Sequence, residues 1–297
     1  MVKHWIEAFR FRTLPLALSC IGMGSILAAY YGAFNWIICL LALLTTLFLQ
    51  ILSNLANDYG DSIHGADSSD RKGPQRTVQQ GVISSAAMKR AIYLFSFFAF
   101  TSGISLLYVA IDFGTTKFYT FLGMGVASII AAIAYTNGKR PYGYLGLGDL
   151  FVLIFFGLVG VGGTYWLFTD DFQFEVFLPA LSCGLLATGV LNVNNIRDIE
   201  SDQTAGKRSI PVRLGRSKAK LYHLSLILAA WLCILYYCVS IYSGVQQFLV
   251  LISLPLFVLH LLRLRKANSP EQVDPLLKQL ALSTLFFVLT FGLGVLL

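Results

Sequence analysis

Three polar residues stand where a long apolar run ends, and their types and spacing could bind a metal ion. Asn54, Asp58 and Asp61 follow the run 36–55 at spacings of i, i+4 and i+7. A helix that continues through them places all three on one face. Carboxylates are disfavoured at a helix C-terminus, where the carbonyl dipoles are already negative. We therefore expect the two acids to repel each other unless a cation binds between them.

A similar cluster ends a later apolar run. Asn194, Asp198 and Asp202 are spaced i, i+4 and i+8. Oxygen ligands of this kind suit Mg²⁺, which takes one or two carboxylates together with waters and substrate phosphates. The alternative is that these are solvated loop acids. Two clusters in matching positions, each preceded by an asparagine that could orient carboxylates or phosphate oxygens, favour the metal site.

Basic residues occupy the polar segments that hold or neighbour the acids. They are Arg76, Lys139, Arg140, Lys207 and Arg208. Lysine and arginine could neutralise phosphate oxygens that the metal leaves unpaired. Acids, metal and bases together describe a diphosphate site. Membrane topology is the alternative explanation for each base taken singly.

The elements that position these residues are predicted to be membrane helices. The chain has 297 residues, of which 56% are hydrophobic and 12% charged, and its mean hydropathy is +0.70. Soluble domains carry about 25% charged residues. The composition predicts an all-α integral membrane protein. The net charge of +7 does not indicate nucleic-acid binding, because basic residues in a membrane protein first report topology.

Nine apolar runs are long enough to span a bilayer. An amphipathic segment, 1–13, precedes them and is expected to lie on the membrane, with Lys3, Arg10 and Arg12 at the headgroups. Pro255 is expected to kink the eighth run. The runs are 14–33, 35–56, 90–111, 117–136, 147–168, 174–196, 219–243, 246–263 and 275–297.

The charges predict the orientation. With nine spans, every lysine and arginine except Lys117 falls on the side of the N-terminus. The positive-inside rule therefore places the N-terminus and all the acid-bearing segments in the cytoplasm. A bacterial inner membrane fits this pattern.

The two acid clusters also suggest an internal duplication within a single polytopic domain, 1–297. Four-helix units would lie within 14–136 and 147–263, followed by a final helix, 275–297. Both acid-bearing helices run in the same direction, so the repeat would be parallel. The glycine-rich run 157–163 is predicted to be a close-packing surface between helices.

These motifs resemble the UbiA superfamily of membrane prenyltransferases. The matching residues are the two Asn/Asp clusters and the segment YTNGK, 135–139, which is similar to the family's YxxxK element. The resemblance covers nearly the whole chain. It implies a nine-helix bundle with a central cavity open to the cytoplasmic face. It also implies that Asp58, Asp61, Asp198 and Asp202 hold Mg²⁺ on a polyprenyl diphosphate, and that Lys139, Arg76 and Lys207 bind the diphosphate oxygens.

The first motif and the segment that follows it, DRKGPQRTVQQG, are similar to the menaquinone branch, the 1,4-dihydroxy-2-naphthoate polyprenyltransferases. The chain departs from the superfamily's usual spacing at position 65, which is Gly; the next acid is Asp67. The branch implies attack on the ring carbon that bears the carboxylate, with loss of CO₂. Tyr144 and Asp149, near Lys139 in sequence, are candidates for positioning the ring.

Two alternatives stay open. A related enzyme could use 4-hydroxybenzoate, homogentisate or a tetrapyrrole at the same diphosphate site. A secondary transporter could bind Na⁺ or H⁺ at the acids. Transporter sites tend to lie near the bilayer midplane in broken helices, often with inverted repeats, whereas these acids are expected at helix ends in a parallel repeat.

Overall fold

The protein is an all-helical membrane protein throughout the part of the chain that its structure describes. The computed structural model describes residues 2–63, 78, 81–171 and 173–297. Within these ranges there is no strand, and nine helical segments are long and apolar enough to cross a membrane. The expected fold class and the expected number of spans are confirmed.

The helices follow one another in a simple up-and-down order. Their bounds are α1 (Val2–Phe9), η1 (Phe11–Thr13), α2 (Leu14–Tyr30), α3 (Trp36–Ile63), α4 (Ser85–Ala110), α5 (Thr116–Ala134), α6 (Gly148–Val152), η2 (Leu153–Gly163), α7 (Thr164–Phe168), η3 (Phe174–Val176), α8 (Phe177–Arg197), α9 (Ile199–Thr204), α10 (Ile210–Ser240), η4 (Val245–Ser253), α11 (Leu254–Lys266) and α12 (Pro270–Leu296).

Several helices are longer than the apolar runs that predicted them, and two of them, α3 and α12, carry polar extensions. α3 continues through the polar residues to Ile63. α12 begins at Pro270, where Ser269 and Gln272 form a capping box that satisfies the first backbone N–H groups. Both extensions are polar, so a search for apolar runs does not include them.

Pro255 leaves the geometry of α11 intact, whereas Gly215 interrupts that of α10. Pro255 does not kink the eighth span, because it stands in the first turn of α11, where its missing N–H costs no hydrogen bond. The nine residues before it, η4, form a tighter 3-10 helix. In α10 the helical geometry breaks at Gly215, whose φ is 73°. The uninterrupted part of α10 therefore starts after Gly215, close to the predicted position 219.

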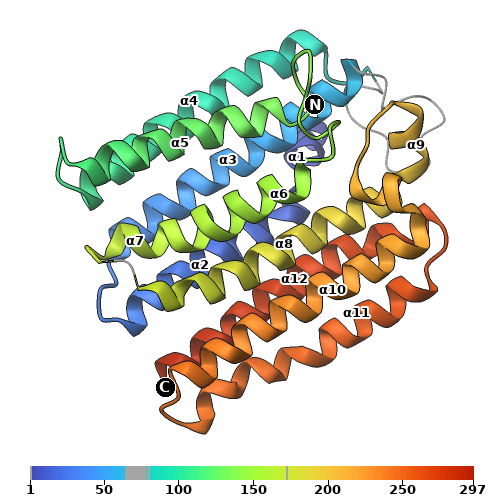
Figure 1. Cartoon of the computed structure of the whole chain (residues 1–297). Helices are drawn as coiled ribbons and strands as arrows, with labels where there is room; N and C mark the ends of the chain where they lie inside the picture. The colour runs from blue at the N-terminus through green and yellow to red at the C-terminus, as the bar shows by residue number, and fades with distance from the viewer. Residues whose placement is uncertain (1, 64–77, 79–80, 172) are drawn as a thin grey trace.

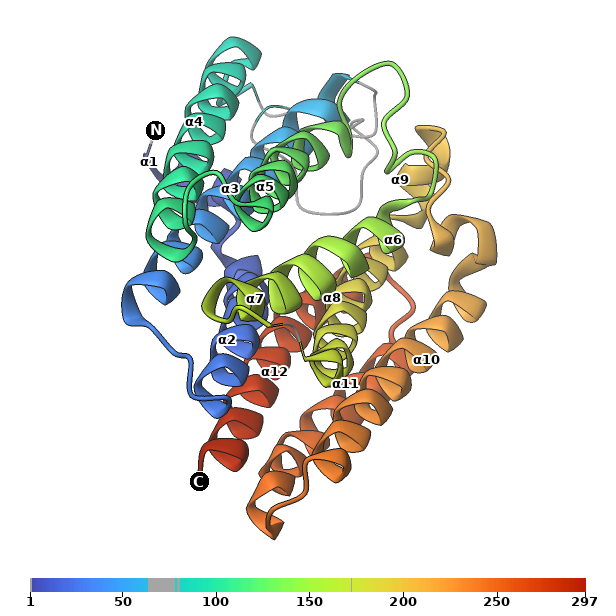
Figure 2. The same cartoon turned by 60° about the vertical axis from the view of Figure 1, so that its left-hand side comes forward.

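The helices form two groups with a seam between them. α3, α4 and α5 pack on one another, and α8, α10, α11 and α12 form the second group. α2 and the π-helical segment η2 lie between the groups, as Figures 1 and 2 show. The largest buried apolar cluster belongs to the second group and α2. A separate cluster holds α1 and α4 against the C-terminal half of α3.

The glycine-rich run is a packing surface, as predicted. A Cβ on Gly157 would lie 2.7 Å from the carbonyl oxygen of Ala180 and 3.0 Å from the Cα of Gly184. α8 and η2 therefore approach backbone to backbone. A π-helix is wider than an α-helix and often marks a functional site, and here it borders the seam between the helix groups.

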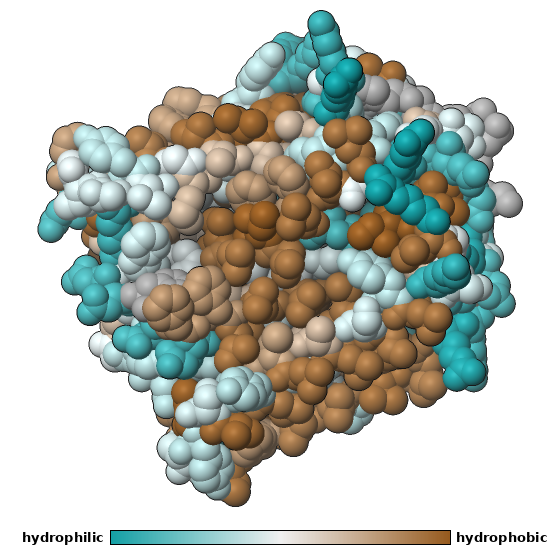
Figure 3. All heavy atoms as spheres, viewed as in Figure 1, coloured by the Kyte–Doolittle hydropathy of each residue, from teal (hydrophilic) through white to brown (hydrophobic). Residues whose placement is uncertain are grey.

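The molecule has a polar surface at each end of its helices. Figure 3 shows a broad apolar surface across the middle of the viewed side, with hydrophilic residues gathered toward the ends. At one end, the Lys117 ammonium donates to the carbonyl oxygen of Thr169 over 2.6 Å and pairs with Asp170 at 3.7 Å. The acid clusters lie at the other end. The N- and C-termini are at opposite ends (Figure 1).

Candidate active site

The first motif lies on the last turns of α3. Because the helix continues to Ile63, Asn54, Asp58 and Asp61 share one face, as their spacing predicted. All three are buried. Buried carboxylates need counter-charges or hydrogen-bond donors, and two different segments supply them.

Arg10 supplies the counter-charge for Asp58. Their side chains form a buried ion pair, which corrects the expectation that Arg10 lies at the lipid headgroups. The backbone of Arg10 has φ 51° and ψ 52°, and it is the only non-glycine residue with a positive φ in the part of the chain described here. This turn separates α1 from η1 and directs the chain toward α3. Asn54 fixes it there by donating to the carbonyl oxygen of Phe9 over 2.9 Å.

Asp61 is held by the connection between α5 and α6. The Tyr144 hydroxyl donates to Asp61 Oδ1 over 3.0 Å. The start of this connection packs against α3, where Thr136 and Asn137 both donate to the carbonyl oxygen of Ala56, over 3.1 and 2.8 Å. Gly60 makes this approach possible, because a Cβ there would lie 2.5 Å from Thr136 Oγ1. The YTNGK segment is thereby fixed beside the first motif.

The second motif spans a break between two helices. α8 ends at Arg197, Asp198 follows it, and Asp202 lies on the short helix α9. The Arg197 guanidinium donates to both oxygens of Asp198, over 2.8 and 2.7 Å. It also donates to Asn194 over 2.8 Å and to Asp274 of α12 over 2.6 Å. Asp198 is thus buried as a bidentate ion pair.

Asp202 retains an oxygen without a partner. Its Oδ1 lies 3.4 Å from the Lys207 ammonium, and its buried Oδ2 accepts no hydrogen bond from any described residue. Burial raises the pKa of Asp202 to about 6. Lys207 opposes this rise, and the charges of Asp198 and Asp61 add to it. Acids of both motifs therefore act on one another at one end of the molecule.

Lys207 lies between two aromatic rings. Its ammonium is 5.7 Å from the ring centre of Tyr135 and 5.8 Å from that of Tyr144, distances typical of cation–π contacts. The backbone N–H of Arg208 donates to the carbonyl oxygen of Tyr144 over 2.9 Å, which joins the α5–α6 connection to the α9–α10 connection. Burial raises the pKa of Tyr135 to about 12, so its hydroxyl stays protonated.

The acids could contribute to a metal site but do not form a complete one by themselves. Among the described residues, no three histidine, cysteine or acidic side chains converge as metal ligands. Arginines pair with Asp58 and Asp198, whereas the free oxygen of Asp202 is a hard donor suited to a divalent cation. Such an arrangement fits a metal that takes part of its coordination from substrate phosphates.

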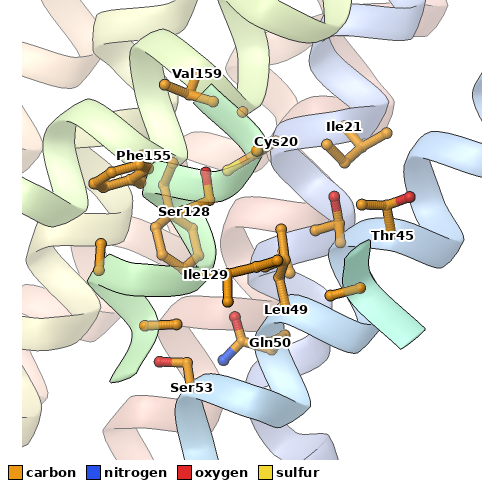
Figure 4. A pocket seen from close by; sticks show the side chains of 18 of the residues that line it. Cys20, Ile21, Thr45, Leu49, Gln50, Ser53, Ser128, Ile129, Phe155 and Val159 are labelled. Carbon is orange, nitrogen blue, oxygen red and sulfur yellow. The ribbon is translucent and has the colours of Figure 1, made fainter. Parts of the chain in front are cut away.

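A cavity of about 350 Å³ runs from this site into the membrane-spanning region. Most of its lining is apolar and comes from α2, α3, α4, α5 and η2. In Figure 4, Gln50 and Ser53 lie at one end and Val159 at the other. The polar residues Arg10, Asn54, Asn194 and Tyr135 also border it, but the four motif aspartates do not. The cavity could hold a long apolar group whose polar head reaches the acids.

The remaining predicted residues are placed as follows. Asp149 is buried at the start of α6 and accepts from the Tyr222 hydroxyl over 2.9 Å, and it does not line the cavity. Lys139 is exposed on the α5–α6 connection and is not brought to the acids by any described contact. Arg76 and Asp67 lie outside the described residues.

Three residues of the site were missed by the sequence analysis. Arg10 was assigned to the membrane surface, Arg197 was read only as a topological charge, and Asp274 was not singled out. Arg12 pairs with Asp274 at 3.2 Å, so the segment before α2 connects to both motifs. An acid near the start of an apolar helix, as Asp274 is, was the one available signal.

Comparison with known proteins agrees with this architecture. The model of the UbiA prenyltransferase family matches residues 17–296. The 1,4-dihydroxy-2-naphthoate octaprenyltransferase of Haemophilus influenzae is 43% identical over 99% of this chain and 96% of that protein.

Two solved structures share the fold. A UbiA homologue from Aeropyrum pernix K1 has a TM-score of 0.69 and 20% identity, over 96% of this chain and 97% of that one. A UbiA homologue from Archaeoglobus fulgidus, bound to GPP and Mg²⁺, has a TM-score of 0.61 and 15% identity, over 97% and 99%. With a family match along almost its whole length and this close full-length relative, the chain belongs to the UbiA prenyltransferase family.

Proposed function

We propose that the protein transfers a polyprenyl group from a polyprenyl diphosphate to 1,4-dihydroxy-2-naphthoate, with loss of CO₂ and diphosphate. The product would be demethylmenaquinol, an intermediate of menaquinone biosynthesis. The observation that carries this proposal is the 43% identity, along nearly both full chains, to a protein of that named activity. The geometry supports it, because buried acids and bases stand at the head of an apolar cavity.

The diphosphate would bind between the two motifs. Lys207 is buried beside Asp202 and would neutralise phosphate oxygens. Asn54 and Asn194 border the cavity and would orient the diphosphate as it enters. Lys139 and Arg76, from two different cytoplasmic connections, would add charge to its exposed side.

Mg²⁺ is the proposed cofactor. Asp58, Asp61, Asp198 and Asp202 would hold it, with Asp202 Oδ2 as the donor that no described residue occupies. The Archaeoglobus homologue was solved with GPP and Mg²⁺, which supports a divalent ion in this fold. When bound, Mg²⁺ supplies positive charge to the leaving diphosphate.

The chemistry requires little more from the chain than positioning and electrostatics. The allylic C–O bond breaks and its electron pair leaves on the diphosphate. The ring carbon that bears the carboxylate forms the new C–C bond, and the C–CO₂ electron pair then returns to the ring. Carbon dioxide leaves, and the overall reaction consumes no oxidant. Lys207 would stabilise the charge that develops on the leaving group. Tyr144 and Asp149 would orient the ring.

We further propose that the site faces the cytoplasm of a bacterial cell, with the protein in the inner membrane. The acid clusters share an end of the molecule with the basic connections, whereas Lys117 pairs with Asp170 at the opposite end. This charge distribution fits a cytoplasmic N-terminus.

The test is an acceptor comparison with purified protein in nanodiscs. A labelled polyprenyl diphosphate is supplied with 1,4-dihydroxy-2-naphthoate or 4-hydroxybenzoate, with Mg²⁺ or with EDTA. We expect prenylated product only from the naphthoate and only with Mg²⁺. Product from 4-hydroxybenzoate alone would overturn the acceptor assignment and keep the diphosphate site. A folded sample that binds no diphosphate and forms no product would overturn the proposal that the protein is an enzyme.

A further inference from the structure

The Arg197 side chain is shared between two carboxylates. Its Nε and Nη2 atoms donate to Asp198, and its Nη1 donates to Asp274 Oδ1 over 2.6 Å. Nη2 also donates to Asn194 Oδ1 over 2.8 Å. The side chain of Arg197 is only 2% exposed, so these contacts replace the water that the guanidinium has lost. All three of its nitrogens are therefore bound by the protein.

Asp274 belongs to neither motif, yet it joins the second motif to the segment before α2. It lies near the start of α12. Its carboxylate accepts from Arg197 on one side and from Arg12 on the other, with Arg12 Nη1 at 3.4 Å from Oδ1 and 3.2 Å from Oδ2. Three elements, α8, α12 and η1, therefore meet at this one carboxylate.

The bidentate pair between Arg197 and Asp198 opposes the proposed role of Asp198 as a metal ligand. A divalent cation and a guanidinium compete for the charge and the lone pairs of one carboxylate. Asp198 can bind a cation well only when Arg197 loosens its hold, and a buried guanidinium that loses its only carboxylate is strongly destabilised. Asp274 changes this balance, because Arg197 keeps a carboxylate 2.6 Å away when Asp198 turns to another partner.

We propose that Asp274 is a positioning residue, which holds the Arg197 guanidinium and thereby lets Asp198 bind Mg²⁺. This inference rests on the proposed function, which makes Asp198 a metal ligand. Asp274 does not line the cavity, so it acts through Arg197 rather than on the substrates. Arg12 works against it, because its charge draws on the same carboxylate. Loss of Asp274 and loss of Arg12 should therefore not affect metal binding in the same direction.

The experiment measures metal binding without turnover. Mn²⁺ replaces Mg²⁺, so that electron paramagnetic resonance distinguishes bound from unbound ion. The protein is held in nanodiscs with an unreactive thiolo analogue of geranyl diphosphate, and a sample without protein corrects for metal bound by the analogue in solution. A second titration, in EDTA, measures binding of the analogue alone.

The variants are Asp274→Asn, which keeps the shape of the side chain, and Arg12→Gln. The matched control is Glu200→Gln. Glu200 is an exposed acid at the same end of the molecule, and it pairs with Arg216. Glu200→Gln therefore removes the same charge as Asp274→Asn from a place where Arg197 is not its recorded partner.

We expect the dissociation constant of Mn²⁺ to rise about ten-fold in Asp274→Asn. This is less than the loss of a fully buried partner would cause, because the side chain of Asp274 is 27% exposed. The metal-free analogue should bind this variant at least as tightly as the wild type, since one negative charge fewer stands near the site. Arg12→Gln should bind Mn²⁺ as tightly as the wild type or more tightly. Glu200→Gln should match the wild type in both titrations.

Unchanged Mn²⁺ binding in Asp274→Asn would overturn the proposal. Equal weakening of Mn²⁺ and of the metal-free analogue would also overturn it, because that pattern assigns Asp274 to the fold alone. The same holds for a loss in Arg12→Gln that matches the loss in Asp274→Asn, and for a wild-type protein that binds no Mn²⁺ beside the analogue. A wild-type protein that binds Mn²⁺ but forms no prenylated product contradicts the proposed function alone, since neither titration uses the acceptor.

Discussion

Each acid of the two motifs is buried beside a specific partner. Asp58, Asp198 and Asp202 form ion pairs with Arg10, Arg197 and Lys207 respectively. Asp61 accepts a hydrogen bond from the Tyr144 hydroxyl. Removing one member of a buried pair leaves an uncompensated charge. Substitutions of these residues should therefore preserve side-chain shape, so that loss of function is not confused with loss of fold.

Asp202→Asn keeps the shape of the side chain and removes its charge. Because Asp202 Oδ2 is the described acid oxygen left without a partner, we expect prenyl transfer to fall on the order of 100- to 1,000-fold, as when one charge-stabilising group is removed. Turnover under saturating donor and acceptor measures this, with thermal unfolding as the check on folding.

Glu200→Gln is the matched control. Glu200 lies on the same short helix but pairs with Arg216 at the surface, 2.7 Å away. Surface pairs contribute about 0–1 kcal/mol, so its activity should stay near wild type. Equal activity in Asp202→Asn and Glu200→Gln would remove Asp202 from the site.

The spacing of residues predicted the acids but not their partners. Asn54, Asp58 and Asp61 were predicted to share a helical face, and α3 confirms it. The pairing of Arg10 with Asp58 was not predictable, because it depends on a left-handed turn at a non-glycine residue that only the packed structure stabilises. Lys139 was expected beside the acids, and the contacts of the described residues do not place it there.

At the scale of elements, hydrogen bonds join α3 and the α5–α6 connection into one unit. Thr136 and Asn137 bond to the α3 backbone at Ala56, and Tyr144 bonds to Asp61 one turn further on. The first motif and the YTNGK segment are thus positioned by the same contact. Hydropathy could not reveal it, because both segments are polar.

Gly60→Ala should damage this unit. Its Cβ would lie 2.6 Å from the backbone oxygen of Thr136, and that atom cannot move without shifting the connection. We expect a loss of about 1–3 kcal/mol in unfolding free energy, typical of overpacking, together with reduced activity because Asp61 is adjacent. Thermal unfolding in detergent and the prenyl-transfer rate measure the two effects.

Gly123→Ala serves as the comparison. Gly123 lies in α5, and no neighbouring atom of the described residues comes within 4 Å of the place that an added Cβ would occupy. The extra methyl group should therefore be neutral or slightly stabilising. A Gly60→Ala protein as stable and as active as Gly123→Ala would show that the close approach is not needed.

At the scale of the whole molecule, hydropathy and charge predicted most of the fold. The nine spans follow from the lengths of the apolar runs. The grouping of the acid-bearing helix ends follows from the side of the bundle to which each loop is assigned. The extensions of α3 and α12 and the π-helical segment η2 did not follow, because they depend on polar contacts and on close packing with α8. The internal duplication stays a prediction.

The proposed orientation can be tested by labelling single introduced cysteines. Asp112→Cys and Lys218→Cys place exposed thiols at opposite ends of the helices. In intact cells, a maleimide that does not cross the membrane should label Asp112→Cys, and should label Lys218→Cys only after lysis. The parent protein, whose cysteines are buried or half-buried, gives the background. The reverse pattern would invert the topology.

The release of the acceptor's carboxyl carbon tests the proposed reaction most directly. The naphthoate is labelled at that carbon, and labelled CO₂ is counted against prenylated product in the wild type and in Asp202→Asn. We predict one CO₂ per prenyl group transferred, with both products abolished by EDTA and nearly absent in Asp202→Asn. Prenylated product that retains the label, or CO₂ released without prenyl transfer, would contradict the account.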